Sequence, residues 1–222
     1  MLTSLLKWSK AWFKLSESER KIRKLEKEKL QAELAALKAQ MNPHFLFNSL
    51  NNIYSLALDR DEKTPEIVLG LSNCLRYMLY ECQEEKVPLK NAIAYLKEFI
   101  QLQQLRLEHP ENIKFKTTGI IDKQKIAPLL FTPILENGFK HGIKGDTQNA
   151  YLNIHIHVDR NQLTLQAENN RGQSIDIEPE SFGGLGLKNV NQQLHLLYPD
   201  KHHLEIQEEE HRFSIQLKLL LS

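Results

Sequence analysis

Residues 151–170 read YLNIHIHVDRNQLTLQAENN, and apolar and polar side chains alternate along two runs of this segment. Strict alternation is typical of a strand that covers a core with one face and meets solvent with the other. The four residues between the runs, 159–162, predict a hairpin turn. The segment therefore predicts two antiparallel strands, residues 151–158 and 163–167.

Other strand and helix patterns surround this hairpin. Short runs with strand character occur at residues 113–118, 203–207 and 212–219, and helical patterns at 127–141 and 187–198 interrupt them. Strands with helices stacked on one face form a two-layer α/β sandwich. Because the composition changes near His109-Pro110, we expect this sandwich to occupy residues 110–222.

The first 40 residues differ in character. They contain ten Lys or Arg and five Glu, and neither Gly nor Pro, which predicts one long basic helix. Apolar residues recur at spacings of three and four, with one five-residue skip, at Ile22, Leu25, Leu30, Leu34, Leu37 and Met41. This seam predicts a coiled-coil stem in a parallel dimer. A basic amphipathic segment with two tryptophans precedes the seam, so a membrane-proximal segment is the alternative interpretation.

Residues 41–109 predict a second helical region. Helical patterns run over residues 43–58, 65–82 and 89–107, separated by polar breaks. Two long antiparallel helices in each chain, doubled by dimerisation, make a four-helix bundle. The expected fold class is α plus α/β, with a coiled-coil stem over 1–40, a dimeric helical hairpin over 41–109 and the sandwich over 110–222.

Composition excludes several classes of protein. The 222 residues are 41% apolar and 26% charged, which is too apolar for a disordered chain. No apolar run approaches the roughly 18 residues of a membrane span, so the chain as given is not expected to cross a bilayer. Two cysteines predict neither a disulfide framework nor a zinc site, and they indicate a cytoplasmic setting. A net charge of +1 gives no electrostatic reason to expect nucleic acid as a partner.

The first candidate site is the heptapeptide NPHFLFN, residues 42–48. His44 falls in the opening turn of a predicted helix, and Asn48 follows one turn later on the same face. An imidazole is mostly neutral at pH 7 and offers a ring nitrogen as a nucleophile or a ligand. A histidine beside two phenylalanines is more often a packed or capping residue, so the heptapeptide alone leaves both interpretations open.

The second candidate site is LENGFKHG, residues 135–142. At helical spacing Asn137 and His141 share one face, and Glu136 and Lys140 share the next. An asparagine carboxamide can complete the oxygen shell of a phosphate-bound Mg²⁺. An ordinary surface ion pair between Glu136 and Lys140 is the alternative.

The third candidate site is FGGLGLKNV, residues 182–190. Glycines directly ahead of an amphipathic helix let the backbone bend around an anion, and the helix N-terminus supplies unpaired N–H groups. A flexible hinge is an equally open interpretation. Residues 167–172, AENNRG, end a predicted strand, and a side chain that reads the edge of a ring would lie there.

Three segments, in this order along the chain, resemble the LytS/YehU-type family of sensor histidine kinases: LKAQMNPHFLFNSLNNI (37–53), LENGFKHGI (135–143) and GGLGLKNV (183–190). They are similar to its phosphoacceptor box, its N-box and the glycine box of the GHKL ATP-binding fold. The resemblance implies a protein histidine kinase that binds ATP and Mg²⁺ and forms a homodimer. It also implies phosphoryl transfer to an Asp of a response-regulator receiver domain, often in a protein with a LytTR-type DNA-binding domain. Members usually carry a membrane-spanning sensor ahead of this region, so the chain is expected to be the cytoplasmic portion of an inner-membrane sensor.

The same resemblance assigns roles to residues of this chain. It implies that His44 accepts the γ-phosphoryl group of ATP and that Asn137 binds Mg²⁺. The other implied nucleotide contacts are Lys140 and His141 at the phosphates, Gly184, Gly186 and Leu187 at the lid, and Asn169 at the adenine.

Several positions depart from the family pattern. Asn169 stands where the family has an Asp, and its amide can accept from the adenine amino group and donate to the neighbouring ring nitrogen. Gln193 stands where many relatives have an Arg, which removes one possible phosphate contact. Phe45 follows the phosphoacceptor where other histidine kinases have an acid, so Glu136 is the candidate base for the His44 proton. The alternatives are a dimeric scaffold with a decayed ATP site and a GHKL-fold ATPase in which Glu136 activates water.

Overall fold

The structure is a computed structural model that describes residues 12, 16–17, 19–25, 28–29, 43–105, 107, 109–142, 150–170 and 184–221. In the two helices that begin at residues 43 and 184, side chains are described from Phe45 and Gly186 onward. The contacts group the chain into two compact units, residues 1–47 and 48–222. Among the described residues, no helix combines the length and the apolar character that a membrane span requires.

The described part of the N-terminal unit is helical. Residues 16–17, 19–25 and 28–29 have helical backbone, and Arg23 pairs with Glu19 one turn before it at 3.4 Å. Ile22 and Leu25 of the expected seam expose 54% and 55% of their surface. The seam residues from Leu30 to Met41 lie outside the described residues, so the dimeric stem stays a prediction.

Three helices follow, close to the predicted bounds. They are α2 (Pro43–Leu58), α3 (Thr64–Tyr80) and α4 (Leu89–Gln104). A tight turn joins α2 to α3, in which the Lys63 backbone N–H donates to the Asp61 side chain at 2.8 Å. Between α3 and α4 lie a short 3₁₀ helix, η1 (Glu81–Gln83), and a two-residue strand, β1 (Val87–Pro88).

Helix α4 packs between α3 and the rest of the larger unit. The rings of Tyr77 in α3 and Tyr95 in α4 stack with centroids 4.7 Å apart. On the other side, Phe99 of α4 meets Phe139 edge to face at 6.2 Å. In addition, β1 pairs with β3 (Lys125–Ile126). Residues 87–104 are therefore packed against elements beyond residue 110, while the expected division at 109–110 stays a prediction.

In the part of the chain that the structure describes, the larger sheet has five strands in the order β2-β4-β5-β7-β6. Its strands are β2 (Ile113–Gly119), β4 (Leu152–Asp159), β5 (Gln162–Asn170), β6 (His202–Glu208) and β7 (Arg212–Leu220). Among the described strands of this sheet, β2 and β4 run parallel and the other neighbours antiparallel, and the β4–β5 hairpin closes with Asp159 opposite Gln162. The hairpin that the alternating pattern predicts is thus confirmed.

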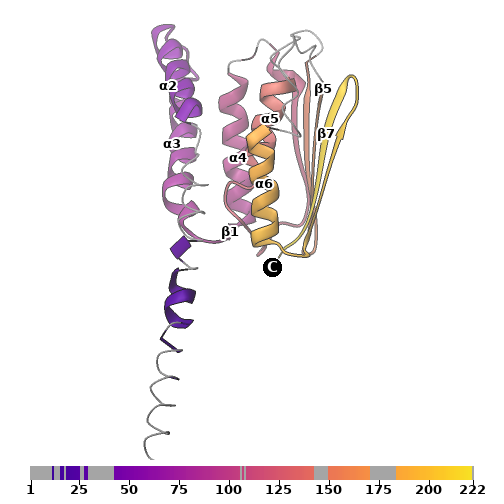
Figure 1. Cartoon of the computed structure of the whole chain (residues 1–222). Helices are drawn as coiled ribbons and strands as arrows, with labels where there is room; N and C mark the ends of the chain where they lie inside the picture. The colour runs from indigo at the N-terminus through magenta and orange to yellow at the C-terminus, as the bar shows by residue number, and fades with distance from the viewer. Residues whose placement is uncertain are drawn as a thin grey trace, which may run out of the picture. The chain divides into compact units, whose positions relative to one another are not determined.

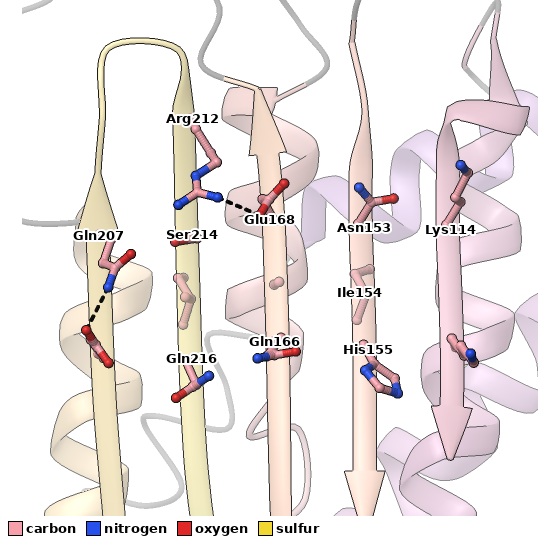
Figure 2. Close-up of a pocket in the computed structure, with 14 residues that line it drawn as sticks. Lys114, Asn153, Ile154, His155, Gln166, Glu168, Gln207, Arg212, Ser214 and Gln216 are labelled. Atoms are coloured by element: carbon pink, nitrogen blue, oxygen red, sulfur yellow. Dashed lines mark hydrogen bonds and ion pairs between the residues drawn. The ribbon is translucent and has the colours of Figure 1, made fainter.

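Helices cover one face of this sheet. Figure 1 shows α4, α5 (Thr132–Gly142) and α6 (Gly184–Leu197) together on one side of the strands. Leu163 and Leu165 of β5 point to that side and are fully buried. The opposite face carries polar side chains over a shallow hollow of about 530 Å³, with His155, Gln166 and Gln216 side by side in Figure 2. The mixed helical and sheet fold expected from the sequence is confirmed in this coarse form.

One helix begins later than predicted. The helical pattern over 127–141 predicts a start at Ala127, but α5 begins at Thr132. Leu129 has φ 59°, in the left-handed region, and a helix cannot continue through that conformation. Pro133 occupies an early position of α5, where its missing N–H leaves no helical hydrogen bond unmade.

Three buried tyrosines predict a loss of stability in alkali. Burial raises the pKa of Tyr77, Tyr95 and Tyr198 above the ordinary value of 10.0. The folded state thus retains phenol protons that the unfolded chain releases, so stability is complete below pH 10 and declines as pH rises further. Each tyrosine contributes a slope of up to about 1.4 kcal/mol per pH unit.

Urea unfolding at successive pH values above 9 measures this slope. Tyr77→Phe is expected to reduce the slope of the free energy of unfolding against pH by the contribution of about one proton. Tyr54→Phe is the matched control, because Tyr54 is 65% exposed. Equal slopes for wild type and Tyr77→Phe would contradict the prediction.

Candidate functional site

Helix α5 lies unusually close to the sheet because two glycines face it. A Cβ on Gly138 would lie 2.7 Å from Leu152 Cδ1 of β4. One turn later, a Cβ on Gly142 would lie 2.6 Å from Asn169 Cβ of β5. Both distances are shorter than carbon contacts allow. The end of α5 and the end of β5 therefore meet at Gly142 and Asn169.

Asn169 is a buried polar residue on the side of the sheet that the helices cover. It is 2% exposed, and its Nδ2 donates to the Asn170 carbonyl oxygen at 2.8 Å. Glu168, its neighbour, faces the opposite side and pairs with Arg212 at 3.4 Å, as Figure 2 shows. Strand alternation therefore directs Asn169, not Glu168, toward the helices.

The polar residues of α5 differ in exposure. Glu136 and Asn137 are half-buried, whereas Lys140 and His141 are exposed. Burial raises the pKa of Tyr95 in α4, and the negative charge of Glu136 adds to this rise. Asn137 immediately precedes the sheet-facing Gly138, and His141 immediately precedes Gly142. This part of the site thus combines an amide, a cation and an imidazole at the end of one helix.

The start of α6 lies against the start of α5. Gly184 is the first residue of α6, and a Cβ on Gly186 would meet Pro133 Cβ at 3.6 Å, an ordinary contact. Leu187 is 3% exposed and lies on the buried side of α6 with Val190 and Leu194. Gly172 and Gly183 lie outside the described residues. The structure thus brings Gly186 to α5 and places Leu187 in the core.

The phosphoacceptor candidate lies in the first turn of α2. The backbone of His44 is helical, and its side chain lies outside the described part of the structure. The following residue, Phe45, is buried, whereas Phe47 is 66% exposed. The role of His44 stays a prediction.

The amide of Asn137 fits the role of one ligand to a phosphate-bound Mg²⁺. Among the described residues, no cluster of three or more His, Cys, Asp or Glu could hold a metal ion. Asn137 offers one amide oxygen, half-buried on α5. Mg²⁺ keeps several waters and commonly takes its other ligands from the phosphates of its substrate. The Asn137 amide oxygen is therefore sufficient as the protein's ligand to such a Mg²⁺ ion.

Two residues of this region were missed by sequence reasoning. Gly138 appears in the sequence only as part of a motif, yet it sets the distance between α5 and β4. Tyr198, just after α6, appears only as the end of an amphipathic pattern, yet its phenol accepts a hydrogen bond from the Ala127 N–H at 2.7 Å. The sequence offered one signal for this role, which is that a tyrosine ends the apolar face of the predicted helix. A buried phenol usually has a hydrogen-bond partner.

Gly142→Ala is expected to destabilise the protein. The added Cβ would lie 2.6 Å from Asn169 Cβ, so the helix and the strand must separate. Overpacking of this kind lowers the free energy of unfolding by about 1–3 kcal/mol. Urea unfolding measures the loss, with Gly186→Ala as the matched control because its Cβ makes only ordinary contact. Equal stability of the two variants would contradict the close approach.

Comparisons with known proteins agree with the motifs. The profile of the histidine kinase family matches residues 32–110. The sensor protein LytS of Oceanobacillus iheyensis is 31% identical over 199 residues, which are 84% of this chain and 34% of that protein. The sensor histidine kinase YpdA of Escherichia coli is 30% identical over 187 residues, covering 78% of this chain and 32% of that protein. The chain therefore spans about a third of the length of these relatives.

A solved histidine kinase domain from the Erythrobacter litoralis EL346 blue-light-activated kinase aligns more distantly. Its TM-score is 0.44 at 17% identity, over 87% of this chain and 96% of that chain. The sequence relatives carry the assignment. The chain is therefore similar to LytS-type sensor histidine kinases over most of its own length, and residues 32–110 match the histidine kinase family.

Proposed function

We propose that this chain is the kinase core of a two-component sensor. It binds Mg²⁺ and ATP within residues 48–222, phosphorylates His44 and passes the phosphoryl group to an Asp of a response-regulator receiver domain, in a partner of the LytTR type. The observation that carries the proposal is the close approach of Gly142 and Asn169, because it joins the N-box helix to the strand end that would read adenine.

The nucleotide site follows from the positions of its residues. The Asn169 amide nitrogen has two hydrogens, and only one is needed for its bond to the Asn170 carbonyl. Its oxygen accepts from the adenine amino group, and its second hydrogen serves a ring nitrogen. Asn137 supplies an oxygen to Mg²⁺, which neutralises phosphate charge when bound. Lys140 and His141 contact the phosphates, and Gly184, Gly186 and Leu187 belong to the lid at the start of α6.

The chemical step uses few groups of the protein. A neutral His44 ring nitrogen forms a bond to the γ-phosphorus while the bond from that phosphorus to the β–γ bridging oxygen breaks. ADP leaves with the electron pair, and Glu136 takes the proton that the ring releases. Phosphoryl transfer depends mainly on alignment and on charge neutralisation. The protein's main contribution in this proposal is positioning, and Glu136 is the proposed proton acceptor.

An exposed apolar stripe on α2 supports a homodimer. Phe47, Leu50, Tyr54 and Leu58 recur at helical spacing and expose 66%, 49%, 65% and 65% of their surfaces. A stripe of this size is unusual on a solvated helix. A second copy of the chain, contributing the same helices, would cover it in a four-helix bundle. The aligned part is only 34% of the LytS relative, and we also propose that the chain is the cytoplasmic portion of a membrane-bound sensor.

The test is incubation with γ-labelled ATP and Mg²⁺. We expect an acid-labile, alkali-stable label on the protein, which a receiver domain then removes. Phosphate release without labelled protein would favour an ATPase in which Glu136 activates water. Absence of heat on calorimetric titration with Mg²⁺ and ATP would favour a scaffold, which the replacements at Asn169 and Gln193 would explain.

A further inference from the structure

The segment that leads into α5 is buried and conformationally constrained. Ala127, Leu130 and Phe131 are each 3% exposed or less. Leu129 between them has φ 59°, a conformation that a branched side chain adopts only when its surroundings enforce it. The Thr132 N–H donates to the Leu129 carbonyl oxygen at 3.1 Å, so the turn leads directly into the helix. The geometry of residues 127–131 therefore sets the direction of α5.

Tyr198 holds this segment from α6. It follows the last residue of α6 and is 1% exposed, and the Ala127 N–H donates to its phenol oxygen at 2.7 Å. The tyrosine itself is fixed, because its N–H donates to the Leu194 carbonyl at 2.9 Å and its own carbonyl accepts from His202 Nδ1 at 2.7 Å. One phenol therefore connects the end of α6 to the segment that precedes α5.

The same ring meets the connection between α3 and α4. Lys86 Nζ lies 5.5 Å from the ring centroid of Tyr198, within the range of a cation–π interaction. Lys86 precedes Val87, which pairs with Ile126, the residue before Ala127. The Leu89 N–H also donates to the Gln124 carbonyl oxygen at 2.8 Å. The connection that follows α3 is thus joined to both helices of the nucleotide site.

We propose that Tyr198 is a positioning residue that holds α5 and α6 in register for nucleotide binding and couples both helices to the connection after α3. The inference deepens the proposed function and rests on it, since it takes α5 and α6 as the nucleotide-binding helices. Without the phenol oxygen, the buried Ala127 N–H has no acceptor, and the segment must shift to find one. Such a shift moves Asn137 and Gly142 relative to Asn169. Burial raises the pKa of the phenol, so it keeps its neutral form at physiological pH.

Tyr198→Phe tests the proposal by removing one oxygen and keeping the ring. Hydrogen exchange of the whole chain without nucleotide is expected to accelerate about tenfold at Ala127 and in the first turn of α5, and not in α4. Calorimetry is expected to give a Kd for Mg²⁺-ATP about tenfold weaker. Tyr80→Phe is the matched control, since Tyr80 is 73% exposed.

Lys86→Met tests the coupling of Tyr198 to the connection between α3 and α4. It also replaces Tyr198→Phe as the test if that variant folds poorly. It removes the cation and keeps a side chain of similar length, and the Kd is expected to weaken about threefold. An unchanged Kd would remove Lys86 and its connection from the proposal.

A purely structural role would lower the melting temperature of Tyr198→Phe but leave its Kd and α5 exchange at wild-type values, and that result would overturn the proposal. If the wild type binds no ATP, the proposed function fails instead. In that case, exchange at Ala127 and in α5 still decides whether Tyr198 fixes the helix.

Discussion

Replacing His44 by glutamine is expected to reduce the acid-labile label from γ-labelled ATP by at least roughly a hundredfold, because the amide has no nucleophilic ring nitrogen. ATP affinity is expected to stay at the wild-type value, since the residues proposed for the nucleotide lie in residues 48–222. If His44→Gln loses the label but still binds ATP, then His44 accepts the phosphoryl group and is not part of the ATP-binding site. Autoradiography and calorimetry on the same preparation measure the two quantities.

The matched control is His203→Gln, which makes the same change at an exposed position of β6. It is expected to label like the wild type. An acid-labile label that persists on His44→Gln would assign the phosphoacceptor to another histidine. Loss of ATP binding in His44→Gln would instead indicate that the substitution disturbs the fold.

Replacing Asn137 by alanine is expected to weaken Mg²⁺-ATP binding by roughly 10- to 100-fold, because one oxygen ligand of the bound ion is lost. Autophosphorylation at subsaturating ATP should fall by a similar factor. Binding of ADP in the presence of a metal chelator should change little, since the adenine contact at Asn169 is intact. Calorimetry with and without Mg²⁺ distinguishes loss of the metal ligand from loss of the site.

Two further variants sharpen this test. Asn153→Ala makes the same change on the polar face of the sheet, where Figure 2 shows Asn153 away from the helices, and is expected to bind as the wild type does. Asn137→Asp keeps an oxygen and is expected to retain part of the Mg²⁺-dependent affinity. Wild-type affinity of Asn137→Ala for Mg²⁺-ATP would show that Asn137 is not a ligand.

The hairpin and most helices could be predicted because their signals are local. Alternation along residues 151–158 and 163–167 specifies both strands and the face that each side chain takes, whereas the extension of the second strand to Asn170, which turns Asn169 inward, is seen only in the structure. Polar breaks and Pro65 similarly delimit α3, which the structure begins at Thr64. In these segments each residue's preference agrees with the final fold, so a short window of sequence is sufficient.

The start of α5 could not be predicted in this way. Residues 127–131 continue an apolar pattern that is compatible with a helix, and nothing local reveals the left-handed Leu129. In the folded chain, Leu129 is left-handed and the Ala127 N–H donates to the Tyr198 phenol, 71 residues away. Contacts between distant residues thus hold this segment in a conformation that the local pattern does not reveal, and they also give Tyr198 the role that we propose.

The sequence by itself determines the chemistry of the motifs and the face to which each strand residue points. Both depend on residue types and on their spacing along the backbone. The three boxes, the buried strands and the substitution of Asn169 for an acid all belong to this class. Other features were decided only by the tertiary structure. They are the contact of Gly142 with Asn169, the packing of α4 against α3 and α5, and the hydrogen bond between Tyr198 and Ala127. They depend on close packing between segments that are remote in sequence, and only folding brings such atoms into contact.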